Sequence, residues 1–453
     1  MKDLTVGKES RLIWRFAIPM LIGNVFQQLY NVVDSIVVGK FIGDEALAAV
    51  GASFPVLFVL ISLTIGITTG ATIVVSQFFG AKDNQSVKRT IDTVFIFIFW
   101  ASIILTLIGF ILSSYIFKWL ALPEEIIPEA TLYFRIYVSG ILLMFGFYGT
   151  SAVLRGLGDS KTPLYFMIIS TLLIIVLDVF FVIVLKMGVE GVAIATVISH
   201  GVTFIGSIVY LNKFHPLIRF SFRKLVFDKI IFIKSLRIGI PTGMQQTFVS
   251  LGMLALMRIV SDFGTETIAA YTVAGRLDMF AAMPAMNFSM ALTSFVGQNI
   301  GANQIERVRK GFVATLKMTS IVSITMTATF FLLGEPIMRI FTNDSEVVAI
   351  GVSYLRITSL FYLVFSSMFV THGVLRGAGD TLIPMFITLI SLWVLRVPFS
   401  YFLSRESFGL GSDGIWWGIP IAWTAGFCLS YIYYKTGRWK RKAIIKHPVI
   451  GEI

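Results

Sequence analysis

Long apolar runs, separated by short segments that carry charged residues, Pro or Gly, form the dominant pattern along the 453 residues of this chain. Each run supplies the roughly 20 apolar residues that an α-helix needs to cross a bilayer. Reading the runs between their breaks predicts twelve membrane-spanning helices, at residues 14–38, 47–78, 91–114, 131–154, 163–185, 190–211, 236–259, 268–297, 314–333, 348–375, 383–403 and 412–434. The chain is therefore predicted to be an all-α polytopic membrane protein.

The composition and the placement of charge agree with this class. Hydrophobic residues make up 56% of the chain and charged residues 14%, whereas soluble domains carry about 25% charged residues. The formal net charge of +12 would suit nucleic acid, but the basic residues lie between the predicted helices, mostly in the connections on the side of the N-terminus. Because basic connections stay in the cytoplasm, we predict a cell-membrane protein with both termini cytoplasmic and no nucleic-acid partner.

Four short segments of the chain recur at an offset of 221 residues, the interval from Leu154 to Leu375. The matching pairs are LRGLGDSKTP with LRGAGDTLIP, QFFGA with QNIGA, YFRI with YLRI, and the triplets at residues 47–49 and 268–270. Collinear matches in one register indicate an internal duplication. Because each copy holds an even number of helices, six, both copies enter the membrane in the same sense.

The duplication predicts two six-helix lobes. The expected ranges are 1–211 for the N-terminal lobe, 212–235 for a basic cytoplasmic linker, 236–434 for the C-terminal lobe and 435–453 for a basic cytoplasmic tail. Two related bundles around a central cleft are typical of an alternating-access carrier.

Polar residues inside the N-terminal lobe are the first candidates for function. The first run carries a stripe of polar side chains at helical spacing, unlike the uninterrupted apolar stretch of a cleaved signal peptide. This stripe faces protein or water and consists of Asn24, Gln27, Asn31 and Asp34. A second acid, Asp178, lies in the fifth predicted helix, and neither acid has an acidic counterpart at the 221-residue offset.

Asp34 and Asp178 are expected to share a layer toward the outer side of the membrane with Tyr133 and Thr196. Two carboxylates, a phenol and a hydroxyl offer only oxygen ligands, which suit a proton or a hard cation such as sodium. A charged residue at a helix centre costs about 2.5 to 3.5 kcal/mol on insertion scales. A role in ion coupling is therefore favoured over the alternative, in which the two acids are hydrogen-bonded structural groups.

The C-terminal lobe carries its own ionisable residues, Arg276, Asp278 and Arg396. One interpretation is that Asp278 pairs with one of the two arginines and packs the lobe, and the other is that one of the three lines a substrate cleft. A stripe of methionines in the eighth helix suits a promiscuous apolar site or, alternatively, ordinary packing. The candidate cleft residues are Gln27, Asn31, Gln245, Gln246, Met283, Met286, Arg276, Asp278 and Arg396.

Motifs for other chemistry are absent from the sequence. It contains no GxxxxGK[ST] segment for ATP and no HExxH segment, its four His residues are scattered, and its single Cys428 lies in an apolar run. We therefore expect neither an enzyme nor a cofactor.

Several segments resemble the multidrug and toxic compound extrusion (MATE) family of prokaryotes. They are YNVVDSIVVGKFIG followed by EALAAVG, then QFFGAKD, LRGLGDSKTP and GVEGVAIAT. The resemblance implies a V-shaped pair of six-helix lobes that exports amphipathic, often cationic drugs or toxic organic compounds in exchange for protons or sodium. It assigns cation coupling to Asp34, Tyr133, Asp178 and Thr196, with Asp34, Asp178 and Thr196 as metal ligands if the ion is sodium.

Two departures from the family pattern bear on the coupling ion. Ile174 stands one turn before Asp178, where many relatives have Asn, and the seventh helix offers Gln245 and Gln246 where some branches have an acid. These departures favour protons over sodium and the N-lobe-coupled, DNA-damage-inducible-like branch. The expected partners are small organic compounds, the coupling cation and membrane lipids, and a monomer is expected. A lipid or lipid-linked oligosaccharide flippase of related architecture is the alternative function.

Overall fold

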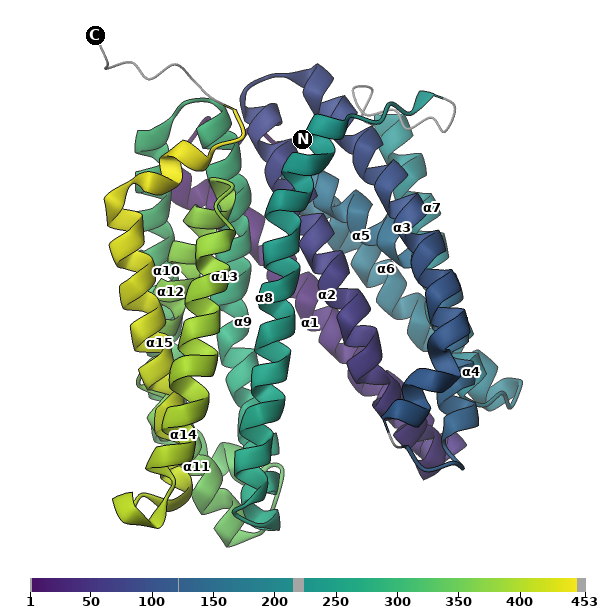
Figure 1. Ribbon diagram of the computed structural model, residues 1–453, viewed down its shortest axis with the longest axis vertical. Coiled ribbons are helices and arrows are strands. Elements are labelled where there is room, and N and C mark those ends of the chain that lie inside the picture. The colour runs from purple at the N-terminus through teal and green to yellow at the C-terminus, as the bar shows by residue number, and fades with distance from the viewer. Residues whose placement is uncertain (1, 121, 215–223, 446–453) are drawn as a thin grey trace. The chain divides into compact units, whose positions relative to one another are not determined.

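The computed structural model describes residues 2–120, 122–214 and 224–445, and throughout these ranges it contains helices and no strand (Figure 1). The helices of the first half are α1 (Glu9–Val37), α2 (Asp44–Gly80), α3 (Asn84–Trp119), α4 (Ile127–Ser139), α5 (Ile141–Gly156), α6 (Lys161–Asp178) and α7 (Val189–Phe214). Short π-helical segments continue two of them, η1 (Val38–Ile42) after α1 and η2 (Val179–Val184) after α6.

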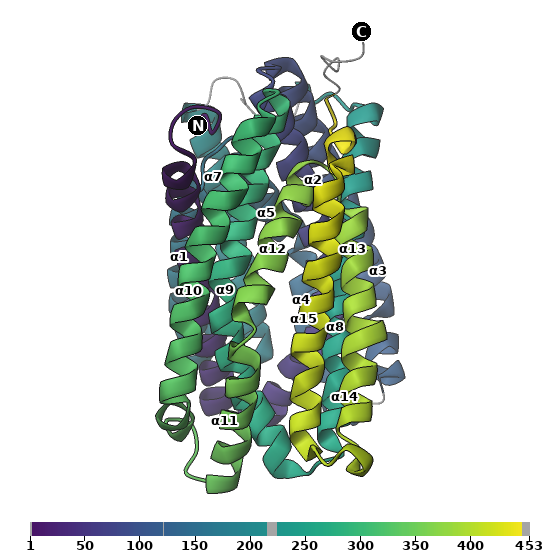
Figure 2. The same ribbon diagram turned by 90° about the vertical axis from the view of Figure 1, so that its left-hand side faces the viewer.

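The second half begins with α8 (Lys229–Ser261), which is followed by α9 (Thr265–Gly301) and α10 (Ile305–Arg339). The remaining elements are α11 (Ser345–Ser359), α12 (Tyr362–Gly377), α13 (Leu382–Leu389), the π-helical η5 (Ile390–Arg396), α14 (Val397–Leu403) and α15 (Gly411–Thr436). Figure 2 shows α10, α12 and α15 side by side, and α9 and α11 pack against them.

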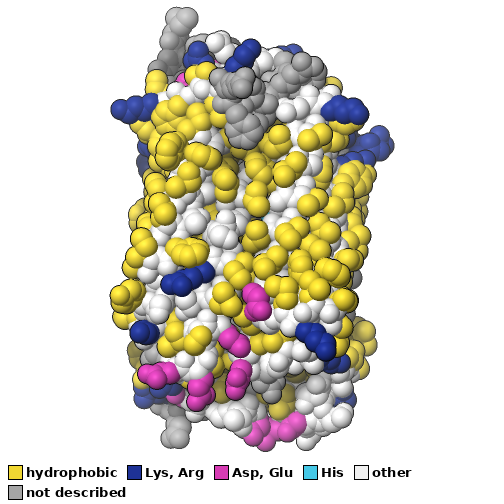
Figure 3. Space-filling model, turned by 90° about the vertical axis from the view of Figure 1, so that its right-hand side faces the viewer, with side chains coloured by type: hydrophobic (Ala, Val, Ile, Leu, Met, Phe, Trp, Pro, Cys, Tyr) yellow, Lys and Arg dark blue, Asp and Glu magenta, His cyan; other side chains and the backbone are white. Residues whose placement is uncertain are grey.

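The described helices follow the twelve predicted spans in order. Eight of them are long and apolar enough to cross a membrane, and the number is ten when each of two bent pairs counts as one span. α1 and α8, which are 29 and 33 residues long, correspond to the other two predicted spans but are not among the helices that are apolar enough by this measure. On the face drawn in Figure 3, hydrophobic side chains cover the middle and most acidic ones lie toward one end. The predicted class, an all-α membrane protein, is confirmed.

The fourth and tenth spans are not the continuous helices that the apolar pattern predicted at 131–154 and 348–375. α4 and α5 meet at a bend of 50° and α11 and α12 at a bend of 51°. At the first bend, a Cβ atom on Gly140 would lie 2.4 Å from the side chain of Val197, so the bend brings bare backbone against α7. The second bend lies at the equivalent place of the repeat, next to Phe361.

Hydrogen bonds between helices also recur at the 221-residue offset. In each case a Thr hydroxyl donates to a backbone carbonyl of another helix. The equivalent pairs are Thr72 to Ala152 at 3.0 Å with Thr293 to Gly373 at 3.1 Å, and Thr106 to Val138 at 2.8 Å with Thr327 to Ser359 at 2.5 Å. The duplication read from short motifs is therefore also present in the packing of the helices.

The two LRGxGD segments end one helix and begin the next. Their second glycines, Gly158 and Gly379, adopt φ angles of 82° and 93°, a left-handed conformation that glycine tolerates best. In the first copy, Asp159 accepts hydrogen bonds of 3.0 Å from the backbone N–H groups of Lys161 and Thr162 and so caps α6. In the second copy, Asp380 instead accepts a hydrogen bond of 2.6 Å from the phenol of Tyr433 in α15.

Contacts divide the chain into two compact units. The first consists of the first two residues with Ile18–Ile240, and the second of Asp3–Ala17 with the chain from Pro241 onward. α1 and α8 therefore belong to both units, and the chain passes from one unit to the other beside Pro19 and Pro241. The predicted lobes, 1–211 and 236–434, differ from the units at these passages. The predicted linker and tail include residues 215–223 and 446–453, which lie outside the described residues.

Within the first unit, α2 and the beginning of α8 approach closely at glycines. A Cβ atom on Gly70 would lie 2.5 Å from the backbone oxygen of Ser235, and one on Gly239 would lie 2.8 Å from that of Gly66. Gly66 and Gly70 form a GxxxG segment, which is typical of close helix packing in membranes.

Replacing Gly70 with Val should therefore destabilise the protein. The added side chain has to push α8 away, and overpacking of this kind typically costs about 1 to 3 kcal/mol. The melting temperature of the purified protein in detergent should fall. Gly51→Val is the matched control in the same helix, because nothing lies within 4 Å of a Cβ atom at Gly51. Equal melting temperatures for the two variants would contradict the packing argument.

Candidate functional site

The two acids of the N-terminal half lie next to π-helical segments. Asp178 is the last residue of α6, directly before η2, and Asp34 lies in the last turn of α1, shortly before η1. π-Helical turns are frequent at functional sites because they re-aim neighbouring side chains. η1 and η2 contact each other, and Asp178 lies within electrostatic reach of Asp34. The predicted pair of carboxylates is therefore brought together.

Three of the four carboxyl oxygens of this pair are enclosed and have no hydrogen-bond partner among the described residues. Asp178 is completely buried, and both of its oxygens are enclosed without a partner among the described residues. Asp34 is half-buried, and its Oδ1 is enclosed in the same way. Buried polar groups are nearly always hydrogen-bonded, and each exception calls for an explanation. An exchangeable proton or cation is the explanation that suits a pair of acids.

Tyr133 and Thr196 come from α4 and α7, which pack against each other. Tyr133 is 6% exposed, and both acids lie within electrostatic reach of its phenol. Thr196 is buried, and its hydroxyl donates to the carbonyl of Val192 at 3.1 Å within α7. No hydrogen bond joins Thr196 to either acid among the described residues. The structure thus places Tyr133 beside the carboxylates and gives Thr196 a bond within its own helix.

Several tyrosines that the sequence analysis did not select lie in the same part of the lobe as the two acids. Tyr30 lies one turn before Asp34 and within its electrostatic reach. Tyr137 lies one turn after Tyr133, and the two rings are 6.3 Å apart. The phenol of Tyr148 accepts a hydrogen bond of 3.2 Å from Gln27. The signal for Tyr30 and Tyr137 was present in the sequence, because each stands one helical turn from a selected residue.

The C-terminal half contains a different acidic cluster. Asp278 of α9 accepts hydrogen bonds from the phenols of Tyr362, at 2.8 Å, and Tyr354, at 3.4 Å. Tyr354 is the equivalent of Tyr133 at the 221-residue offset. The first of the two interpretations, an ion pair of Asp278 with Arg276 or Arg396, was wrong for the part of the chain that the structure describes. Arg396 acts on Asp278 only from beyond ion-pair distance, and Arg276 is exposed.

The other cleft candidates differ in their surroundings. Gln245 is 6% exposed; its amide donates to Thr388 at 2.6 Å and its oxygen accepts from Arg376 at 2.7 Å. These bonds favour a structural role for Gln245 over contact with a substrate. Gln246 is half-buried and Asn31 is exposed. Of the two selected methionines, Met283 is buried in the core and Met286 is exposed.

The residues that the structure describes contain no cluster of three or more His, Cys, Asp and Glu side chains that could hold a metal ion. A sodium ion at the candidate site would rely on Asp34 and Asp178, whose three enclosed oxygens have no partner. Carboxyl oxygens are chemically suited to a proton or a hard cation.

Matches to known proteins agree with this arrangement. The MatE family model matches residues 19–180 and 241–402. The chain belongs to the MatE family. The two matched ranges begin at Pro19 and Pro241, where α1 and α8 pass between the units, so the family pattern follows the internal duplication.

Curated relatives match over nearly their whole length. The probable multidrug resistance protein YpnP of Bacillus subtilis is 33% identical to this MatE chain, over 97% of the chain and 97% of YpnP. The probable multidrug resistance protein NorM of Thermotoga maritima is 30% identical, over 97% of the chain and 95% of NorM.

Solved structures share the fold. An outward-facing multidrug resistance MATE family transporter of the MOP superfamily superposes with a TM-score of 0.90 at 25% identity, covering 97% of this chain and 99% of its own. A MOP superfamily transporter from Pyrococcus furiosus, described as having a binding pocket of reversed polarity, superposes with a TM-score of 0.89 at 25% identity and covers 97% and 98%. This MatE protein is therefore a membrane transporter and not an enzyme, and the resemblance found in the sequence is confirmed.

The network around Gln245 yields a test of its role. Gln245→Leu should lower the melting temperature, because it leaves the half-buried Arg376 without this partner, and hydrogen bonds to charged groups contribute about 1.5 to 3 kcal/mol. Gln246→Leu, the same change one residue on, should have a smaller effect. If Gln246→Leu lowered the melting temperature as much as Gln245→Leu, the structural role of Gln245 would be wrong.

Proposed function

We propose that this MatE protein is a secondary active antiporter that exports amphipathic, often cationic organic compounds in exchange for protons by alternating access. It would act in the cell membrane with both termini in the cytoplasm. The observation that carries the proposal is the pair Asp34 and Asp178, whose enclosed oxygens have no partner among the described residues. The names of the relatives, probable multidrug resistance proteins, support the class of substrate.

The carboxylate pair suits a coupling site because of its charge. Two carboxylates close together resist ionising at the same time, and a buried ionised group without a partner is costly. When the site is closed, a proton or a cation between Asp34 and Asp178 removes the repulsion. When the site opens to water, both carboxylates can ionise and release the ion. The occupancy of the site is thereby linked to the conformation of the protein.

Protons are favoured over sodium by the number of ligands. Sodium needs several oxygen ligands, as hard cations do. Ile174, one turn before Asp178, is buried and its side chain offers none, so Thr196 is the further oxygen ligand that the sequence places near the two acids. A proton needs only one carboxyl oxygen. The branch of the family that couples through its N-terminal lobe is the one that this arrangement suits.

The energy available from one proton is sufficient for useful export. A charge that crosses a potential of about 100 mV releases about 2.3 kcal/mol, which corresponds to a roughly fifty-fold gradient of a neutral compound. Exchange of one monovalent cation for one proton cancels the electrical term and leaves only the pH gradient. The substrate contacts would come from polar and flexible residues of both halves, among them Asn31, Gln246 and Met286.

Asp34→Asn should abolish active export while leaving the protein folded. The amide imitates the protonated carboxyl permanently, so no ion is released and the cycle does not turn over. Efflux of ethidium from energised cells should fall to the rate of cells without the transporter. Asp178→Asn should act in the same way, and the double variant should be no worse than either single variant because the pair holds one ion.

Glu335→Gln is the control for this test, since it makes the same change in an exposed ion pair with Arg339. It should leave efflux at the wild-type rate. Active export by Asp34→Asn at the wild-type rate would remove Asp34 from the coupling site.

Removal of sodium should not affect export. In vesicles that contain the purified protein, an imposed pH gradient in sodium-free buffer should drive transport of ethidium at the full rate. An imposed sodium gradient without a pH gradient should drive none. The reverse result would assign sodium as the coupling ion, with Asp34, Asp178 and Thr196 as its ligands.

A further inference from the structure

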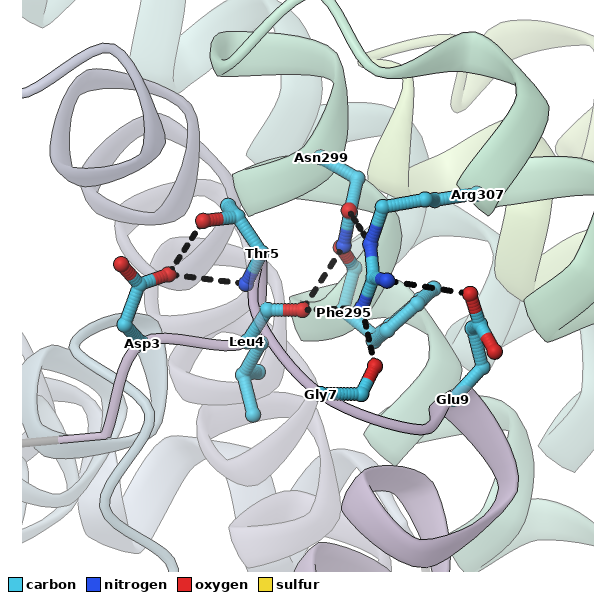
Figure 4. Close-up of polar contacts among 8 residues, drawn as sticks. All are labelled: Asp3, Leu4, Thr5, Gly7, Glu9, Phe295, Asn299 and Arg307. Atoms are coloured by element: carbon cyan, nitrogen blue, oxygen red, sulfur yellow. Dashed lines mark hydrogen bonds and ion pairs between the residues drawn. The ribbon is translucent and has the colours of Figure 1, made fainter.

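The segment before α1 is docked on α9 within the second unit (Figure 4). Leu4 is 1% exposed. Its N–H donates to the side-chain oxygen of Gln298 at 2.8 Å, and its carbonyl accepts from the amide of Asn299 at 3.2 Å. Gln298 and Asn299 open the QNIGA segment, one of the repeated motifs. This motif therefore provides the surface on which the beginning of the chain is held.

Arg307 of α10 fixes the same segment from the other side. Its Nε donates to the oxygen of Asn299 at 3.0 Å, its Nη2 donates to the carbonyl of Gly7 at 2.9 Å, and its Nη1 forms an ion pair of 3.0 Å with Glu9 (Figure 4). The first turn of α1 is thus joined to both α9 and α10.

A groove lies between this docked segment and α10. Its volume is about 530 Å³, and Lys8, Glu9 and Ser10 line one side of it while α10 lines the other. We call it the Lys317 groove. The charged residues that line it are Lys8, Arg309, Lys310 and Lys317 together with Glu9 and Glu306.

The charge of the Lys317 groove is unbalanced. Glu9 is already paired with Arg307, so Glu306 is the only other acid in the lining. The side chains of the four basic residues form no hydrogen bond or ion pair with other residues in the described part of the chain. The groove therefore offers several positive charges to an anion.

The position of the Lys317 groove along α10 indicates a ligand that is partly apolar. Lys317 lies two helical turns beyond Lys310, about 10 Å along the axis of α10, inside a helix apolar enough to span the membrane. Val313, Ala314 and Met318 line the groove between and beside these lysines. An exposed ammonium at this depth is costly unless it reaches the interface or meets an anion. In a phosphate that carries acyl chains, the phosphate can pair with the lysines and the acyl chains can pack against the apolar residues.

We propose that the Lys317 groove binds the phosphate headgroup of an anionic phospholipid, and that the bound lipid holds the segment from Asp3 to Ala17 on α9 and α10. Lys8 approaches the phosphate from the docked segment, and Lys310 and Lys317 approach it from α10. The chain enters the other unit beside Pro19, so this segment anchors the helix that carries Asp34. The proposal does not depend on the substrate or on the coupling ion.

Binding can be measured on the full-length protein in neutral detergent. The probes are phosphatidylglycerol, phosphatidylcholine with the same acyl chains, and inorganic phosphate. Native mass spectrometry reports bound lipid, and hydrogen exchange reports protection of the amides in residues 3–12, including the Leu4 amide that bonds Gln298. Phosphatidylglycerol should bind and slow this exchange, whereas phosphatidylcholine and inorganic phosphate should not.

Lys310→Gln combined with Lys317→Gln should weaken binding of phosphatidylglycerol about tenfold or more, since each basic residue near an anionic surface contributes to the attraction. The protection of residues 3–12 should be lost with it. Lys161→Gln combined with Lys229→Gln is the matched control, because it removes two exposed lysines from the other unit. This control should bind the lipid as the wild type does.

Three results would overturn the proposal. They are equal protection by phosphatidylcholine, equal protection by inorganic phosphate, which would assign the groove to free phosphate, and unchanged lipid binding in the Lys310 and Lys317 double variant. Asp34→Asn should retain the lipid effect, so a failure of the coupling proposal is distinguishable from a failure of this one.

Discussion

The absence of water from the hydrocarbon of a bilayer is the constraint on which this structure depends. A backbone N–H or C=O group in that region has to be bonded within the protein, and helices meet this requirement within a single segment. Because of the same constraint, the hydrogen bonds of the few polar side chains indicate which of them are structural. The Thr72 and Thr293 hydroxyls bond carbonyls of neighbouring helices, whereas the oxygens of Asp178 bond nothing among the described residues. Other enclosed polar groups also lack a partner among the described residues, but a carboxyl group can take up a proton or a cation at physiological pH, which makes Asp34 and Asp178 the candidates for ion exchange.

The duplication repeats the helix framework in both halves of the chain, but the acidic residues of the two halves differ. Both halves share the bent fourth helix of the repeat and the interhelical threonine bonds. Tyr133 and Tyr354 occupy equivalent positions, yet Tyr133 lies near two acids of the first half and Tyr354 donates to Asp278. A repeated framework allows both halves to move in related ways, while the unpartnered acids of one half give that half the role of ion coupling in our proposal.

The beginnings of α1 and α8 connect the two units through the chain. Each helix starts among the residues of one unit and ends in the other, and each contains a proline at the passage. Proline removes a backbone hydrogen bond inside a helix and so permits a bend there. The glycine contact of α8 with α2 and the hold of Arg307 on Gly7 and Glu9 fix the two beginnings.

The sequence by itself determined the class of fold, the order of the helices, the duplication and the family, because apolar length and repeated motifs are properties of the chain alone. It also selected Asp34 and Asp178, since an acid in an apolar run is conspicuous without a structure, and it selected Tyr133 through the layer that it is expected to share with them. Only the tertiary structure decided which polar residues meet. Arg376 donates a hydrogen bond to Gln245, and tyrosine phenols, not an arginine, contact Asp278. The fourth and tenth spans are bent, which the sequence did not predict. These outcomes depend on packing between helices far apart in sequence, such as Gly140 against Val197, and the hydrophobic pattern of a single helix contains no information about its neighbours.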